Sequence, residues 1–230
     1  MGDVASTIAD PADPPNTALR LQILSSEQWN LLSTRSMTYN EMYSRTGIFL
    51  TVVSAAVVAL ALVAQATDFG HGFYAFALLV LPVVLFLGVA TYLRLNDANY
   101  ENVWLVFGMN RLRHAYLELA PELEPYFITG HHDDERGLLQ STNPDARPRL
   151  SRILYGTPML VGVVTCVLAG VLLGLVAKTT GAPSGLSIAL GGSAAAVLIV
   201  GLVESSRRHI DRLRAAWVPR FPGRDAPMAG

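Results

Sequence analysis

The sequence contains few charged residues. Charged residues make up 15% of its 230 residues, whereas an average soluble protein contains about 25%. Apolar residues make up 51%, and the uncharged stretches are concentrated rather than spread along the chain. This concentration favours membrane-spanning helices over a large soluble core. The formal net charge is −1, so the overall charge balance predicts no nucleic-acid partner.

The sequence also has almost no cysteine. Cys166 is the single one, and it lies in an apolar stretch where it cannot form an intrachain disulfide. It therefore supports neither a redox site nor a zinc site. Residues 1–19 contain three aspartates and no lysine or arginine. Because a secretory signal peptide begins with basic residues, we expect no cleaved leader and a retained first span.

Catalytic motifs are missing too. The sequence contains no phosphate-binding loop, dinucleotide fingerprint, GxSxG elbow or CxxC pair. No Asp, Glu, Lys, Arg or His lies within the expected membrane depth. This counts against an ion-coupled transporter, a proton relay and a voltage sensor, because all three need such groups. We therefore predict no cofactor and no enzymatic activity.

Four apolar runs stand out against these absences. The first two, Ile48–Ala64 and Phe73–Leu93, are separated by a short turn, and so are the other two, Ile153–Ala177 and Leu186–Val203. About 20 residues at roughly 1.5 Å rise each match the bilayer core of about 30 Å. Because each turn is short, we expect the two helices of each pair to lie antiparallel and in contact.

These patterns predict an all-α membrane protein with four transmembrane helices in two hairpins and a helical cytoplasmic layer. Amphipathic periods over Ser25–Arg45, Asn96–Leu119 and Ser205–Trp217 supply that layer, and residues 130–149 read as an irregular loop. The predicted units are a disordered N-terminal tail (1–19), an amphipathic helix (20–45), a first hairpin (46–93), a cytoplasmic helix and loop (94–152), a second hairpin (153–203) and a basic tail (204–230).

The cationic residues predict the orientation, because Lys and Arg are disfavoured on the translocated side. Three precede the first span, seven lie between the second and third, and six follow the fourth, whereas the two short turns hold only Lys178. This distribution predicts a multi-pass protein of the inner or plasma membrane with both termini in the cytoplasm.

Small residues recur every four positions along the last two spans. Such rows let helix backbones approach closely, which drives association where lipid is as apolar as the side chains. Packing inside one four-helix bundle and an interface between copies both fit this pattern, and we expect a homo-oligomer. The predicted packing residues are Gly162, Cys166, Gly170 and Gly174, and Ser187, Gly191 and Ala195.

One cluster invites a metal hypothesis. His131, His132, Asp133, Asp134 and Glu135 are consecutive, and imidazoles with carboxylates can bind zinc or manganese. Five consecutive residues cannot all point at one ion, however, and catalytic zinc sites use pairs spaced three or four residues apart. A solvated acidic turn is therefore the favoured interpretation, with these five residues kept as weak metal candidates.

Two basic clusters each adjoin an expected cytoplasmic end of a span. They fix the topology, and each would also attract anionic lipid, by about 1 kcal/mol per residue near the surface. We therefore expect the lipid bilayer, and anionic lipids within it, as partners. The clusters are Arg147, Arg149 and Arg152, and Arg207, Arg208, Arg212 and Arg214.

The layout resembles uncharacterised bacterial four-span integral membrane proteins. The resemblance rests on SSEQWNLLSTRSMTYNEMYSR before the first span and RLNDANYENVWLVFGMNRLRHAYLEL after the second. It implies the four-span arrangement and brings no functional residues with it. More distantly, the layout is similar to small membrane-spanning effectors whose helical cytoplasmic part couples to a sensor.

The functional prediction is a non-enzymatic integral membrane module that self-associates or binds a partner through its cytoplasmic helices. An oligomeric ion-conducting pore, lined by Thr51, Ser54 and neighbouring residues of the first span, is an alternative. A metal-dependent hydrolase carried by His131–Glu135 is a further alternative. A substrate transporter is less favoured, because four spans without a buried charge offer a polar solute little to bind.

Overall fold

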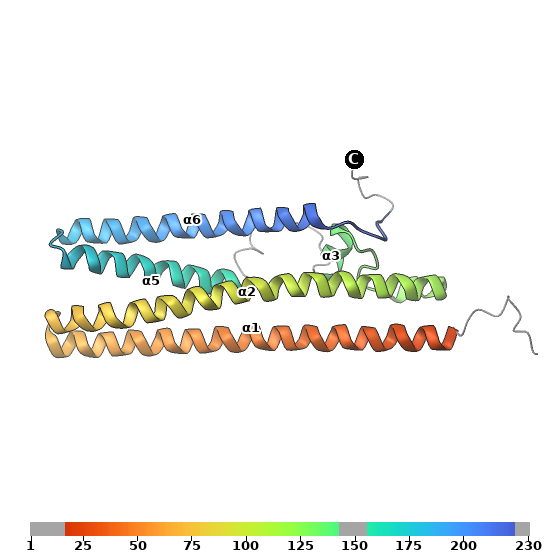
Figure 1. Ribbon diagram of the computed structural model, residues 1–230, viewed down its shortest axis with the longest axis horizontal. Coiled ribbons are helices and arrows are strands. Elements are labelled where there is room, and N and C mark those ends of the chain that lie inside the picture. Colours follow the sequence, from red (N-terminus) through yellow and green to blue (C-terminus); the bar gives the residue numbers. More distant parts are fainter. Residues whose placement is uncertain (1–16, 143–155, 224–230) are drawn as a thin grey trace, which may run out of the picture.

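The computed structural model describes residues 17–142 and 156–223, with the backbone only along 209–216. Over these ranges the chain is helical and contains no strand, which confirms the predicted all-α class (Figure 1). The elements in chain order are α1 (Thr17–Thr67), α2 (His71–Leu119), the 3-10 helix η1 (Pro121–Tyr126), α3 (Glu135–Thr142), α5 (Thr157–Thr179) and α6 (Ser184–Ala216).

Four of these helices are long and apolar enough to cross a membrane: α1, α2, α5 and the Ser184–Arg208 part of α6. With 51 and 49 residues, α1 and α2 are about 75 Å long, more than twice the ~30 Å bilayer core. The 23 residues of α5 come to only about 35 Å. A single crossing therefore leaves a long part of α1 and of α2 outside the bilayer.

The four long helices form an open row in the order α1, α2, α5, α6 (Figure 1). Helix α2 packs against α1 on one side and α5 on the other, and α6 packs against α5. A closed four-helix bundle would bring α1 and α6 together as well. Within the described ranges, the outer face of α1 and the outer face of α6 are therefore left without an extensive helical neighbour.

Helices α1 and α2 keep one antiparallel register from their turn to their far ends. Buried side chains recur every three or four residues along α2, the spacing of a coiled-coil seam. Each residue closer to the start of α1 meets a residue closer to the end of α2. From the turn outward, the pairs are Phe49 with Gly88, Glu41 with Arg94, Arg35 with Asn102, and Leu31 with Gly108.

A hydrophobic cluster joins α1, α2 and α5 about midway along the lengths of α1 and α2. It contains Met42 and Phe49 from α1, Leu95 and Ala98 from α2, and Val161 from α5. Phe49, Leu95 and Val161 are fully buried. The cluster lies where the expected spans end and the charged part of the chain begins. It therefore fixes the position of the polar parts of α1 and α2 relative to the apolar parts of α1, α2 and α5.

Two sequence expectations about helix boundaries were wrong. Helix α1 begins at Thr17 rather than near Ser25, because residues 17–24 are mostly good helix formers. Ser25 lies within this helix, and its hydroxyl donates to the Gln22 carbonyl at 3.1 Å. The loop 130–149 was predicted to be irregular, but it contains α3. The predicted disordered tail, apart from residues 17–19, lies outside the described residues.

The small residues of α5 lie against those of α6. A Cβ placed on Gly170 would come 2.5 Å from the Gly191 carbonyl oxygen, and a Cβ on Gly191 would come 2.5 Å from that of Gly170. Gly174 faces Ser187 in the same way at 3.1 Å, Ala195 lies against Gly170, and Cys166 is buried. Gly162 instead contacts Leu202 and Tyr92.

Gly191→Ala is therefore expected to destabilise the chain, because the added methyl group forces α5 and α6 apart. Overpacking of this kind costs about 1–3 kcal/mol. Its neighbour provides a matched control, since a Cβ on Gly192 meets nothing within 4 Å. In thermal unfolding in detergent, Gly191→Ala should lower the midpoint and Gly192→Ala should not. Equal midpoints for both variants would contradict this packing.

Candidate functional site

The segment His131–Glu135 lies beside the far half of α2, where it meets the last described residues of the chain. We call residues 217–223 the strap. Asp133 is fully buried, and its carboxylate accepts a hydrogen bond from Arg111 Nε at 2.6 Å. It also accepts from the strap backbone, with the N–H of Arg220 at 3.0 Å and that of Phe221 at 2.8 Å. The carboxylate thus joins α2 to the strap.

The neighbouring Asp134 has two structural partners as well. Its Oδ1 accepts from the Gly137 N–H at 2.7 Å, which satisfies an otherwise unpaired donor in the first turn of α3. Its Oδ2 accepts from the Gly223 N–H at 2.8 Å. Asp134 therefore caps α3 and holds the end of the strap. Because Asp133 and Asp134 are both buried, the predicted solvated acidic turn is wrong at these two residues.

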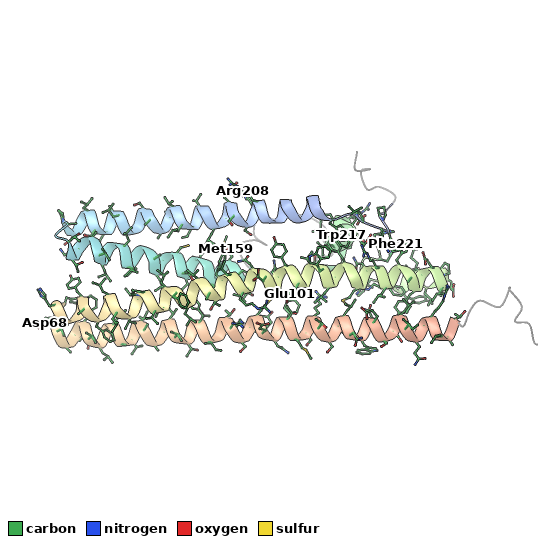
Figure 2. The ribbon with its side chains drawn as sticks, viewed as in Figure 1. Asp68, Glu101, Met159, Arg208, Trp217 and Phe221 are labelled. Atoms are coloured by element: carbon green, nitrogen blue, oxygen red, sulfur yellow. The ribbon has the colours of Figure 1, made fainter. Side chains whose placement is uncertain are left out.

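Trp217 anchors the other end of the strap. Its ring stacks on Phe107, with 4.2 Å between centroids, and meets Trp104 edge-on at 4.8 Å. The Arg111 guanidinium lies 4.6 Å from the indole centroid, a cation–π contact. The indole N–H donates to the Asp133 carbonyl oxygen. Figure 2 shows Trp217 and Phe221 close together at this part of the molecule.

Two histidines contact Phe221, and a third lies beside them. The His114 ring stacks on Phe221 at 4.4 Å between centroids, and His132 Nδ1 is 3.2 Å from the Phe221 carbonyl oxygen. The His131 and His132 rings are 4.1 Å apart. Burial and the proximity of His132 lower the pKa of His131, and Glu124 only partly opposes them. This environment therefore favours the neutral form of His131.

The charge on Asp133 is set by opposing effects. Burial by itself would raise its pKa, but hydrogen bonds from the Arg220 backbone, the Arg111 side chain and the Phe221 backbone outweigh burial and lower the pKa below its usual value. A carboxylate that accepts several hydrogen bonds is stabilised in its charged form. Asp133 is therefore ionised at neutral pH.

Asn110 fastens this site to α2 and is itself fully buried. Its Nδ2 donates to the His132 carbonyl at 2.9 Å, and its Oδ1 accepts from Arg113 Nη1 and from Ser141 Oγ, each at 2.8 Å. Asn110 and the strap carry no local sequence signal of this role, because their partners lie far away in the chain.

The metal hypothesis finds no converging ligands here. Among the residues that the structure describes, no three His, Cys, Asp or Glu side chains lie together as a metal site requires. Both aspartates of the cluster already accept hydrogen bonds from backbone N–H groups, so a cation would have to displace the strap. Glu135 lies in the first turn of α3 and is exposed.

The outer face of α1 is a second candidate surface. We define it by Trp29, Leu32, Ser36 and Tyr43, which share one side of the helix. The exposed fractions of Trp29, Leu32 and Tyr43 are 70%, 42% and 63%. Helix α1 turns a different face toward α2, and Tyr39, which shares the three- and four-residue period of Leu32 and Tyr43, is half-buried. Because contiguous exposed apolar surface is typical of interaction sites, this face is a candidate for one.

An ion-pair network lies at the level of Tyr43, just before the apolar run of the first span. Arg94 binds both oxygens of Glu41, with Nη2–Oε2 at 2.8 Å and Nε–Oε1 at 3.0 Å, and Arg45 Nε is 2.7 Å from Glu41 Oε1. Glu101 accepts from Arg94 at 3.0 Å. Hydrogen bonds from Arg94 and Arg45 lower the pKa of Glu41 to about 2. The network ties α1 to α2 at this level.

The remaining predicted residues do not converge on a site. The hydroxyls of Thr51 and Ser54 donate to carbonyls of their own helix, at 2.9 and 2.8 Å. Arg207 and Arg208 are exposed on α6, and Arg208 pairs with Glu204 at 2.9 Å. Arg212 and Arg214 lie where only the helix backbone is described, and Arg147, Arg149 and Arg152 lie outside the described residues.

An apolar groove of about 280 Å³ opens between α2, α5 and α6. Tyr92, Cys166 and Leu198 are among its lining side chains. The lining offers almost no polar group to orient a polar ligand, and nothing in it resembles a catalytic constellation.

No protein-family model, no curated protein and no solved structure matches the chain.

The Glu41 network predicts an acid-sensitive contact between α1 and α2. Because the pKa of Glu41 is lowered from 4.5 to about 2, its stabilising effect is complete above about pH 4.5 and is lost as the pH falls toward 2. In acid titrations followed by circular dichroism in detergent, the unaltered chain should lose stability relative to Glu41→Gln across this window. A difference between the two chains that does not change with pH would contradict the assignment.

Proposed function

We propose that this chain is a non-enzymatic integral membrane module that associates with other proteins, first of all with copies of itself, through its helices outside the membrane. The observation that carries the proposal is the exposed outer face of α1. Trp29 and Leu32 lie next to each other on that face, and Trp29 is 70% exposed. Large aromatic residues of this kind dominate the binding energy of interfaces.

The distribution of cations supports a cytoplasmic position for this face. Sixteen Lys and Arg residues lie before the first span, between the second and third, or after the fourth, and one lies in a short turn. Cationic loops stay on the cytoplasmic side of a membrane. On this basis both termini, the outer face of α1 and α3 lie in the cytoplasm of a cell whose inner or plasma membrane holds the four spans.

The pairing of α1 with α2 also favours an association module, because it holds the outer face of α1 on a rigid helix. Outside the apolar run, α1 remains paired with α2 through the Arg35–Asn102 hydrogen bond at 2.9 Å and through the Leu31–Gly108 contact. A face that is held on a rigid helix loses little conformational entropy on binding. The cytoplasmic helices therefore present this surface in a fixed position.

Replacing the outer face should break the assembly. We expect the unaltered chain in mild detergent to have the mass of an oligomer, and Trp29→Ala with Leu32→Ala to shift it toward the monomer. Loss of one interface hot spot costs about 2 kcal/mol or more, roughly a thirtyfold change in affinity. Particle mass, measured by light scattering or native mass spectrometry across a dilution series, tests this.

Met37→Ala is the matched control, because Met37 is 68% exposed on the same helix but lies on a different side. It should leave the mass unchanged. A monomeric unaltered chain at all concentrations, or an equal effect of Met37→Ala, would contradict self-association through this face.

A further inference from the structure

We propose that the surface around Asp133 and Phe107 is a peptide-binding site, whose ligand is a bent segment with a tryptophan followed by free backbone N–H groups. In this structure the site is filled by the chain's own strap, residues 217–223. The inference does not depend on the proposed function, because it concerns α2, the loop before α3 and the C-terminal segment rather than the outer face of α1.

The site binds its ligand through hydrogen bonds to the ligand's backbone. Asp133 accepts from two successive N–H groups, those of Arg220 and Phe221, and Asp134 accepts from the N–H of Gly223. His132 Nδ1 faces the Phe221 carbonyl at 3.2 Å. Charge-assisted hydrogen bonds of this kind are roughly twice as strong as neutral ones. Successive backbone N–H groups converge on one anion where the backbone turns, and the strap bends at Arg220 and Phe221.

Two side chains of the strap provide selectivity. Trp217 lies against Phe107, Trp104 and the Arg111 guanidinium, and Phe221 stacks on His114. Arg220 and Val218 point away from the site and are exposed, Val218 to 77%. The recognition pattern is therefore Trp at the first position and Phe four residues later, with little demand on the positions between them.

The strap is able to detach without disturbing the four long helices. Helix α6 packs against α5 and makes no extensive contact with α2, so the strap provides the described link between the outer end of α6 and α2. Among the described residues, detachment breaks the contacts of Trp217 and Phe221 and the hydrogen bonds of Asp133 and Asp134 to the strap backbone. It frees the end of α6 and uncovers Trp104 and Phe107, so the strap acts as a reversible latch between two helices.

Competition in trans tests the site. The probe is a fluorescent peptide with the sequence of residues 217–223, titrated to millimolar concentration against three full-length chains in detergent. In the unaltered chain the attached strap competes at an effective concentration of roughly millimolar, so binding should be weak. In Trp217→Ala with Phe221→Ala the site is vacated, and we expect at least tenfold tighter binding. Adding Asp133→Asn to that pair should abolish it.

The controls distinguish specific binding of the peptide from non-specific binding and from misfolding of the variants. A peptide carrying W217A should not bind any of the chains. Hydrogen exchange of the unaltered chain should show slow exchange at the Arg220 and Phe221 amides, and Asp133→Asn alone should speed both while leaving Ala98 in the core of α2 unchanged. The site is refuted by equal peptide binding to all three chains, by no binding to the vacated chain, or by fast exchange at Arg220 and Phe221 in the unaltered chain.

Discussion

The antiparallel register of α1 and α2 is the constraint on which the rest of the structure depends. Once Phe49 lies against Gly88 and Glu41 pairs with Arg94, the outer halves of both helices are positioned without further adjustment. Thr67 and Gly70 close the turn at one end. Both helices are far longer than one membrane crossing. The pairing that packs their apolar parts together therefore also determines where their polar parts lie.

This constraint explains why the row of helices stays open. Helix α2 has its two sides occupied, by α1 and by α5, and α5 carries α6 on its glycine-rich face. The outer face of α1 is therefore uncovered as a consequence of the order of packing, and Trp29 and Leu32 lie on it. The outer end of α6 would also be loose if Trp217 and Asp133 did not bind it back to α2. The proposed association surface and the proposed latch thus lie at different ends of one row of helices.

The sequence predicted the features that depend on local composition. Run length and absence of charge identified the four apolar helices, and Pro121 marks the end of α2. Features that depend on distant partners were not predicted. Residues spaced three and four apart form one face of α1 that contains Trp29 and another that contains Leu31. Which of the two faces is buried depends only on the position of α2. Asp133 and Arg220 are 87 residues apart, so no local pattern reveals that one binds the other.

The most direct test of this account is the side and face from which α1 is reached. In a Cys166→Ser background, single cysteines at Met37, Leu31 and Asp68 are exposed to a membrane-impermeant maleimide, first on intact cells and then on inverted vesicles. Because Met37 is 68% exposed and lies outside the proposed interface, we predict that Met37→Cys reacts quickly in inverted vesicles only, that Leu31→Cys reacts slowly there, and that Asp68→Cys reacts on intact cells. Labelling of Met37→Cys from outside intact cells, or equal rates at Leu31→Cys and Met37→Cys, would contradict this topology.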